Sequence, residues 1–339
     1  MAGDSTNSQT EMVLLARGAQ VAAIFGAAAS LGLADRIDDE PRPVEALAAE
    51  CGALPDMLVR LCRAMASFGV FSVDADGRIG HTTKSRFLRT DSVPTLHYAI
   101  RYWSLPNVWD ATGNLVHTLR TGQSAFEARH GMPFFDYLRE HPEENAVFDS
   151  FMQNSPDDRH AAVAEAYDLS DAHVLVDVGG GNGAMLAALL QANPNLRGIL
   201  FDREEVVANA WTMLGSLGMR SEVEVGDFFE GVPPGGDVYT LSQILHDWND
   251  EACHVILANI RAAIEPGGRV LVIDRDLDSA EGRANALNFL ADLHMMTLFP
   301  GARERSAAEL GRLFNDTGFG EPRVVRTRSA FTVVETRAV

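Results

Sequence analysis

From residue 173 onward, β-type runs alternate with segments of helical period, and this alternation restricts the fold more than any other feature of the chain. The β-type runs are HVLVDV, LRGILFD, SEVEVGD, DVYTLSQ and GRVLVIDRDL. Between them, helices are expected over GGGNGAMLAALLQA, over 204–217 and over 250–265. Alternation of this kind produces a parallel sheet with helices on both faces. The expected fold class is therefore α/β, with a Rossmann-like, mostly parallel sheet.

The carboxyl-terminal stretch EPRVVRTRSAFTVVETR departs from that alternation. It holds two β-rich runs joined at Ser329–Ala330, with no residues left over for a crossover helix. Parallel neighbouring strands need such a crossover connection, whereas antiparallel neighbouring strands need only a tight turn. One edge strand of the sheet is therefore predicted to run antiparallel.

The preceding half, about residues 11–170, has a mostly helical pattern instead. A helix and turn in RPVEALAAECGALP are followed by a helix in PDMLVRLCRAMASFGVF and by a hairpin around the DADG turn of FSVDADGRIGHT. Helix, turn, helix and hairpin together indicate a winged helix. The period changes near Leu169–Ala172, which predicts a winged-helix domain over 1–170 and a Rossmann-like domain over 171–339. Further helices are expected at 106–120, 133–139, 142–153 and 157–168.

A winged helix serves either DNA binding or protein interaction, and the charge of this chain favours the second. The chain has 47 acidic residues against 28 lysines and arginines, a formal net charge of −19 that repels a phosphate backbone. Its sequence contains no arginine-rich recognition helix. The apolar run 21–34 and the helix around 57–70 offer more hydrophobic surface than a peripheral domain buries by itself. We therefore expect a homodimer and no nucleic-acid partner.

Neither a membrane span nor a metal site is expected. The polar start MAGDSTNSQTEM lacks the positive lead of a signal peptide, and VAAIFGAAASLGLA is too short to span a bilayer. Cys51, Cys62 and Cys253 lack the spacing of a metal site, and Cys253 and His254 project about 100° apart on a predicted helix. Scattered thiols fit a reducing compartment, so a cytoplasmic location is expected.

The loop VDVGGGNGAML, residues 176–186, lies between the first β-type run and its helix. Gly179 permits a tight turn, and Gly181 and Gly183 allow a ligand and the helix to approach the backbone closely. The helix amino terminus then presents free N–H groups and a positive dipole to an anionic group. By itself, the loop is equally typical of a tight turn in an unrelated α/β protein.

Acidic residues follow at the ends of the next two strands. Asp202 ends the second strand about twenty residues after the loop, where a carboxylate accepts hydrogen bonds from ribose hydroxyls. Asp227 and Phe228 follow the third strand, where they suit the amino group and the ring face of an adenine. Ligands of open α/β sheets bind at the carboxyl ends of the strands. The pattern therefore predicts a nucleoside ligand, either NAD or S-adenosylmethionine.

His246, in LSQILHDWND, follows the fourth strand and faces the same crevice. One interpretation is structural, a strand end beside a helix whose cap is Asp247 or Asn249. The other is a base held at the ligand site. Because the cofactor residues are expected at the same sheet edge, the second interpretation is favoured, and a capping role of Asp247 is compatible with it.

VDVGGGNG, FDR, GDFF and LHDWND, in this order and spacing, resemble the S-adenosylmethionine-dependent O-methyltransferases of the caffeic acid and hydroxyneurosporene type. The resemblance extends over nearly the whole chain, because that family also has an amino-terminal winged-helix dimerisation domain. Many methyltransferases share the glycine motif, but its combination with HDW is specific. The resemblance implies transfer of a methyl group from S-adenosylmethionine to a hydroxyl of a small organic acceptor, aromatic or a secondary metabolite.

Residue by residue, the resemblance implies His246 as the catalytic base, with Asp274 and Glu304 as acidic residues beside it. Asp274 stands where plant members have a glutamate, so its side chain is shorter. Ser242 stands where they have a cofactor-contacting lysine, so a charge is missing. The cofactor-binding residues implied by the resemblance are Gly179, Gly181, Asp202, Asp227, Phe228 and Ser242.

The chemistry explains these residue types. A phenol has a pKa near 10 and imidazole one near 6.5, so full proton transfer costs about 5 kcal/mol. Asp274 or Glu304 can lower that cost by stabilising the imidazolium, or proton loss can be concerted with attack. Attack on the sulfonium removes charge, which an apolar pocket favours. Candidate pocket residues are Phe148, Met152, Met295, Met296 and Phe299, with His294 as a second polar group; ordinary core packing is the alternative for each.

Two other functions are compatible with these patterns. One is a methyltransferase-fold enzyme that methylates nitrogen, decarboxylates or hydroxylates, and the other is a winged-helix regulator with a vestigial second domain. His246 disfavours the first, because methylation of a neutral amine needs no comparable base. The low basic content disfavours the second.

Overall fold

The computed structural model describes residues 2–154, 157–208 and 210–339, which form two compact units. A helical unit comprises Met1–Trp109 with Leu138–Pro156, and a sheet unit comprises Asp110–Tyr137 with Asp157–Val339. The backbone therefore passes between the units three times, after Trp109, Tyr137 and Pro156. The domain boundaries inferred from the sequence stay a prediction.

The sheet unit is built on seven strands in the order β6-β5-β4-β7-β8-β10-β9. Strands β4 to β8 pair in parallel, whereas β10 is antiparallel to both β8 and β9. The predicted α/β fold with a mostly parallel sheet is confirmed; β10 is the reversed strand, and β9 forms the edge beyond it. The strands are β4 Val174–Val178, β5 Arg197–Asp202, β6 Ser221–Val225, β7 Val238–Ser242, β8 Arg269–Arg275, β9 Arg323–Arg326 and β10 Phe331–Arg337.

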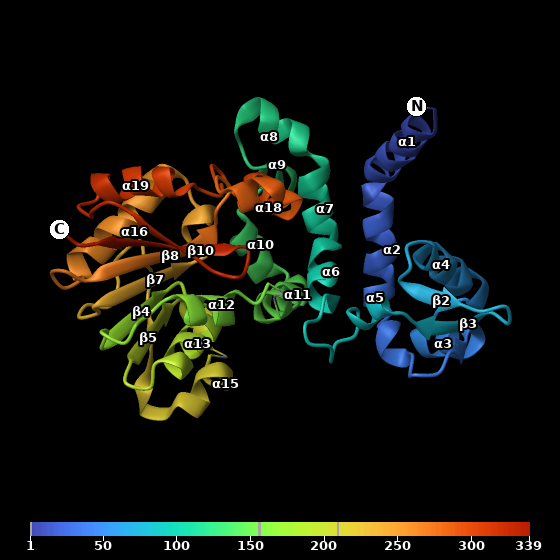
Figure 1. Ribbon diagram of the computed structural model, residues 1–339, viewed down its shortest axis with the longest axis horizontal. Coiled ribbons are helices and arrows are strands. Elements are labelled where there is room, and N and C mark those ends of the chain that lie inside the picture. The colour runs from blue at the N-terminus through green and yellow to red at the C-terminus, as the bar shows by residue number, and fades with distance from the viewer. Residues whose placement is uncertain (1, 155–156, 209) are drawn as a thin grey trace. The chain divides into compact units, whose positions relative to one another are not determined.

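Helices cover both faces of this sheet, with α12, α13 and α15 on one side and α16 and α19 on the other (Figure 1). Each face has its own apolar core. Leu186, Leu190 and Leu200 belong to the first, and Ile256, Leu257 and Phe314 belong to the second. The helices of this unit are α8 Leu115–Thr121, α9 Ala125–His130, α12 Arg159–Ala166, α13 Ala184–Ala192, α14 Glu204–Val207, α15 Trp211–Leu214, α16 Asp250–Ala263, α17 Ala280–Ala284, α18 Ala286–Leu298 and α19 Ala307–Asp316, with 3-10 turns η2 Gly215–Arg220 and η3 Leu245–Asp247.

Two predicted helices are interrupted. The helix expected over 106–120 divides into α7 Pro106–Gly113 and α8, because Gly113 and Asn114 are poor helix formers. The helix expected over 204–217 is replaced, in its described residues, by α14, α15 and the start of η2. Within η2, Gly218 has a φ of 59° and a ψ of −136°, which no helix accommodates.

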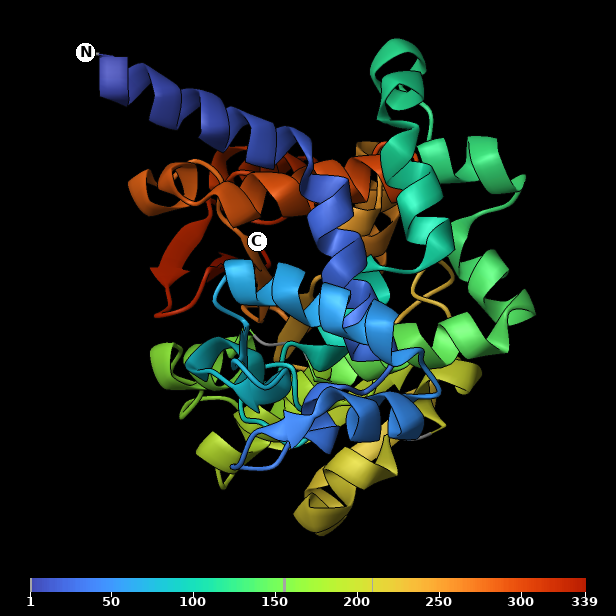
Figure 2. The same ribbon diagram turned by 90° about the vertical axis from the view of Figure 1, so that its right-hand side faces the viewer.

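The helical unit contains the predicted winged helix. Helices α3 and α4 precede the hairpin of β2 and β3, and β1 pairs with β3 to complete a three-stranded sheet. Figure 2 shows α1 leading into α2, with which it makes an angle of 58°. The elements of this unit are α1 Ala2–Ala16, α2 Gly18–Ser30, η1 Ala34–Arg36, β1 Arg42–Pro43, α3 Val44–Cys51, α4 Pro55–Ser67, β2 Phe71–Val73, β3 Arg78–His81, α5 Thr83–Arg86, α6 His97–Trp103 and α11 Pro142–Gln153; α7 and α10 Phe134–Glu140 span the junctions.

In the described part of the chain, none of the helices taken singly has both the length and the apolar composition needed to cross a membrane. The bent pair Ser8–Ala16 and Gly18–Ser30 passes that test together, by length and composition only.

Candidate active site

The glycine loop after β4 has the tight backbone that its sequence predicts. Gly179, Gly181 and Gly183 have φ values of 68°, 62° and 82°, in the left-handed region that other residues rarely adopt. A Cβ on Gly179 would lie 2.5 Å from Cδ1 of Ile244, so a side chain there has no room. At Gly181, by contrast, a Cβ would meet no atom within 4 Å. The loop thus presents its backbone to open space in front of the α13 amino terminus.

Asp202, at the end of β5, is tied directly to that loop. The Gly181 amide donates to Asp202 Oδ2 at 2.9 Å, and the Arg203 amide donates to Oδ1 at 2.8 Å. Burial raises the pKa of Asp202, opposed by these two amides. Each carboxylate oxygen retains a second lone pair, which a ribose hydroxyl can use. Beside them, the Asn182 side-chain nitrogen is buried with no hydrogen-bond partner among the described residues, which is typical of a site that a ligand completes.

The other predicted cofactor residues lie at the same edge of the sheet. Phe228 Cε1 lies 3.5 Å from the position of a Cβ on Gly179, so this ring flanks the glycine loop. Asp227 is exposed, and its Oδ1 accepts the Phe229 amide at 2.8 Å. Ser242 is half-buried at the last position of β7. These positions fit a nucleoside cofactor, and their individual roles stay predictions.

His246 lies in η3, directly after β7, and is buried. Its Nδ1 lies 3.0 Å from Glu304 Oε1, and its Nε2 lies 3.4 Å from Asp247 Oδ1. A Nδ1–H that donates to Glu304 leaves the Nε2 lone pair free to accept a proton. Asp274, at the end of β8, completes the group, since one ligand atom each of His246, Asp274 and Glu304 lies within 4.8 Å of the others. This acidic cluster, His246 with Asp247, Asp274 and Glu304, joins three distant segments.

The acidic cluster is electrostatically unusual. Burial by itself lowers the pKa of His246, but the carboxylates of Glu304, Asp247 and Asp274 outweigh it and raise that pKa to about 10. Burial raises the pKa of Asp247 and of Asp274, and the His246 charge opposes both shifts. One oxygen each of Asp274 and Glu304 is buried and accepts no hydrogen bond from the part of the chain that the structure describes. The cluster is therefore poised to stabilise an imidazolium.

Sequence reasoning missed three contributors to this region. Asp247 or Asn249 is expected to cap α16, and Asn249 does, with its Oδ1 accepting the Ala252 amide at 2.9 Å; the sequence does not predict that Asp247 faces His246. Arg305 was also missed, although it directly follows Glu304 in GARERS. Asp177 is fully buried in β4, and its Oδ1 accepts a hydrogen bond from the Thr240 hydroxyl at 2.6 Å. Burial raises the pKa of Asp177 to about 6. For Arg305, no local pattern of the sequence indicates burial, because the S-x-x-E capping box of Ser306 and Glu309 after it marks only the start of α19.

The predicted pocket residues divide between the two units. In the sheet unit, Phe299 contacts Phe134 and Phe135 at ring-centroid distances of 5.5 and 5.3 Å. Burial, and to a smaller extent the His246 charge, lowers the pKa of His294 to about 4, so this neighbour is neutral at pH 7. Met295 and Met296 are half-buried on α18. Phe148 and Met152 lie on α11 of the helical unit, and their role as pocket residues stays a prediction.

Comparison with known proteins assigns the family. Residues 109–320 match the O-methyltransferase domain, and residues 13–91 match the O-methyltransferase dimerisation domain. The chain belongs to the O-methyltransferase family. Phenazine O-methyltransferase PhzM of Lysobacter antibioticus is 38% identical over 315 residues, which are 92% of this chain and 91% of that protein. The structure of mitomycin 7-O-methyltransferase MmcR matches with a TM-score of 0.92 and 32% identity, covering 100% of both chains.

This O-methyltransferase uses S-adenosylmethionine. Solved structures of relatives contain S-adenosylmethionine or its product S-adenosylhomocysteine. The dimerisation domain supports the expected homodimer, and family membership identifies an enzyme rather than a regulator. Two of the relatives have different chemistry in their names, and one of these is an 8-amino-8-demethylriboflavin N,N-dimethyltransferase of Streptomyces davaonensis. Aclacinomycin 10-hydroxylase RdmB of Streptomyces purpurascens is 34% identical over 305 residues, 87% of this chain and 76% of that protein.

Proposed function

We propose that this O-methyltransferase methylates a phenolic hydroxyl of a small aromatic secondary metabolite, with His246 as the general base and Glu304 and Asp274 as the groups that stabilise its protonated form. The observation that supports this most directly is the buried contact of 3.0 Å between His246 Nδ1 and Glu304 Oε1. It fixes the ring so that Nε2 is the basic atom, as an orienting carboxylate does in other histidine-dependent enzymes.

The acidic cluster lowers the free-energy cost of transferring a proton from a phenol to His246. Transfer from a phenol of pKa about 10 to a free imidazole of pKa about 6.5 costs about 5 kcal/mol. With the pKa of His246 raised to about 10, transfer from the phenol to the neutral imidazole is nearly balanced, and the cost moves to the earlier loss of the proton that His246 carries. The consequence is that His246 is largely protonated at pH 7 in the free protein. It must lose that proton before or during acceptor binding, so turnover is expected to rise with pH.

S-adenosylmethionine supplies the electrophilic methyl group when bound. Asp202 is proposed to accept hydrogen bonds from its ribose hydroxyls, and Asp227 and Phe228 are proposed to hold its adenine. Gly179 and Gly181 give it access to the loop backbone. Ser242 is proposed to contact it at the position where plant members have a lysine. The unpartnered Asn182 amide and the open space at Gly181 support this placement.

An aromatic acceptor is supported by the rings near the acidic cluster. Phe299 follows α18, which carries His294 and Met295, and it packs on Phe134 and Phe135 within the sheet unit. Aromatic side chains favour offset and edge-on contacts with flat ligands. The relatives described above include a phenazine O-methyltransferase, which points to acceptors of the same kind. Three free cysteines fit a reducing environment, so we infer a cytoplasmic location.

The second candidate is hydroxylation or N-methylation on the same fold. A hydroxylase and an N,N-dimethyltransferase among the relatives support it. An amine acceptor that is already neutral needs no base, so the complete acidic cluster around His246 favours the oxygen acceptor.

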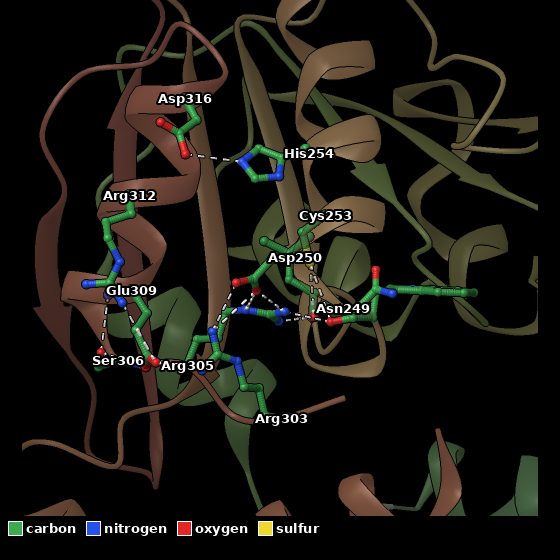
Figure 3. A network of polar contacts seen from close by, with 12 residues as sticks. Asn249, Asp250, Cys253, His254, Arg303, Arg305, Ser306, Glu309, Arg312 and Asp316 are labelled. Carbon is green, nitrogen blue, oxygen red and sulfur yellow. Dashed lines mark hydrogen bonds and ion pairs between the residues drawn. The ribbon is translucent and has the colours of Figure 1, made fainter. Parts of the chain in front are cut away.

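The test compares His246→Ala with wild type on phenols of graded pKa. On a weakly acidic phenol, turnover should fall about 10²- to 10⁴-fold, the usual value of a general base. The loss should shrink for acceptors that are ionised at neutral pH. His254→Ala is the matched control, because His254 lies on α16 and pairs with the exposed Asp316 at 3.3 Å (Figure 3).

Isothermal titration with S-adenosylhomocysteine should give unchanged affinity for His246→Ala, since the cofactor residues are untouched. Wild-type turnover by His246→Ala on a weakly acidic phenol would show that His246 is a capping or positioning residue and that the proposed mechanism is wrong.

A further inference from the structure

Arg305 is a buried cation whose contacts all lie around the turn that holds His246. Its side chain is 2% exposed. Nη1 donates to the carbonyl of Leu245, and Nη2 donates to the carbonyl of Trp248 at 2.6 Å. Nε and Nη2 also donate to Asp250 Oδ1, at 3.0 and 2.8 Å (Figure 3).

These contacts compensate for a weak local structure. The turn η3 has only three residues, and 3-10 geometry gives poorer backbone hydrogen bonds than an α-helix. The carbonyls of Leu245 and Trp248 lie immediately before and two residues after His246, so a single planar guanidinium connects both sides of the turn. Asp250, in the first turn of α16, balances the buried charge and fixes the plane of the guanidinium.

The partner segment is rigid as well. Glu304 and Arg305 directly precede the capping box of α19, in which the Ser306 hydroxyl accepts the Glu309 amide and Glu309 accepts the Ser306 amide. The Glu304 amide donates to Asp292 Oδ1 at 2.9 Å. The backbone that carries Glu304 is therefore fixed to α18 on one side and to α19 on the other.

We propose that Arg305 is a positioning residue for methyl transfer: it clamps the Leu245–Trp248 turn to the Glu304 segment and thereby keeps His246 aimed at the acceptor hydroxyl. This inference rests on the proposed role of His246 as base. The charge of Arg305 also opposes the burial that raises the pKa of Asp274, so the clamp helps Asp274 to remain ionised.

Arg303 provides a matched control in the same segment. Its guanidinium also reaches Asp250, at 3.2 Å, and it pairs with Glu309 at 2.8 Å, but its side chain is 41% exposed (Figure 3). Its backbone amide donates to the His246 carbonyl at 3.0 Å, a bond that Arg303→Lys retains. Arg303→Lys therefore alters an ion pair with Asp250 but leaves the Arg305 bonds to the Leu245 and Trp248 carbonyls in place.

The experiment measures turnover, acceptor KM and S-adenosylhomocysteine affinity for Arg305→Lys and Arg303→Lys, each alone and combined with His246→Ala. A lysine keeps the charge but cannot reach two carbonyls and a carboxylate from one plane. Arg305→Lys is expected to lower kcat about 10- to 100-fold, as a displacement near 1 Å does, with cofactor affinity unchanged. Arg303→Lys should keep wild-type kcat.

The decisive readout is non-additivity. If Arg305 acts through His246, then Arg305→Lys should cause no further loss in the His246→Ala background. An equal loss in both backgrounds, or a parallel loss of cofactor affinity, would make Arg305 a general structural residue and overturn the inference. If Arg305→Lys does not fold, Asp250→Asn loosens the same guanidinium while leaving the carbonyl bonds, and the same comparison applies.

The two proposals fail separately. Full turnover by His246→Ala rejects the base itself. If His246→Ala loses turnover but Arg305→Lys keeps wild-type kcat, only the proposed positioning role of Arg305 is rejected.

Discussion

The two sides of the candidate site are built by different means. On the cofactor side, Gly179, Gly181 and Asp202 belong to one strand–loop–helix unit and the strand after it, and they are joined by backbone amides. On the base side, His246, Asp274 and Glu304 come from three separate segments and meet through buried side chains. The first arrangement follows from local geometry, whereas the second exists only when the whole sheet unit is folded.

The difference also appears in the electrostatics. Asp202 is held by amides that any neighbouring sequence would supply, so its charge is stabilised by the backbone itself. The acidic cluster depends on one imidazolium to balance several carboxylates, and its pKa values are shifted accordingly. We therefore expect the base side to respond more strongly to pH and the cofactor side to depend more on ligand contacts.

Replacing Asp202 tests the cofactor side with the largest effect after that of His246→Ala. Asp202→Ala removes the proposed acceptor of two ribose hydroxyls. At about 1.5 kcal/mol for each hydrogen bond to a charged group, the affinity for S-adenosylhomocysteine should fall about 100-fold. Isothermal titration measures it. Asp237→Ala is the control, because Asp237 likewise accepts two backbone amides, from His173 and Val174, but at the opposite ends of the strands. Equal losses for both variants would contradict the assignment of Asp202.

Replacing Glu304 sharpens the contrast in pH response. The folded pKa of His246 lies above its ordinary value, so the stability that its pairing contributes is present below pH 6.5 and lost as pH rises through about 10. Glu304→Gln should thus lower the free energy of unfolding by about 1.5–3 kcal/mol at pH 6, and by less near pH 10. Urea unfolding at both pH values measures this, and NMR titration of the His246 ring should show a lowered pKa.

The matched control is Glu165→Gln, because Glu165 pairs with Arg328 at the surface with both side chains more than half exposed. Surface pairs of this kind contribute about 0–1 kcal/mol. A stability loss for Glu304→Gln that is identical at both pH values would mean that the charge of His246 does not depend on Glu304.

The smallest expected effect concerns metal. The spacing of His246, Asp274 and Glu304 would also suit a divalent cation. We expect prolonged dialysis against a chelator to leave turnover unchanged, because the proposed mechanism needs only a proton acceptor at His246. A loss of turnover that Mg²⁺ or Zn²⁺ restores would assign the acidic cluster to a metal instead.

The same contrast explains what the sequence could predict. Strand β4 and the glycine loop were located within a residue, because continuous apolar runs and glycines act locally. His246 was also found, since it follows a strand and so must lie at the carboxyl edge of the sheet. Its contact with Glu304 came from the family resemblance, because no local pattern links two segments so far apart in the chain.

What the sequence could not predict depends on tertiary contacts. Asp247 and Asn249 both suit the cap of α16 by residue type, and the folded chain uses Asn249, which leaves Asp247 facing the imidazole. Arg305 has no local signature of burial, since an arginine in a polar segment is usually exposed. Only the folded position of the Leu245 and Trp248 carbonyls gives it a reason to be inside.

The three passages of the backbone between the units have a consequence for recombination. Residues 110–137 belong to the sheet unit by their contacts, and Ser124 donates to the Leu298 carbonyl at 2.7 Å at the end of α18. A chimera spliced once, at any junction, therefore combines parts of one compact unit from two parents. Exchange of whole units between relatives requires a two-part graft, in which residues 1–109 and 138–156 travel together and 110–137 stays with the recipient.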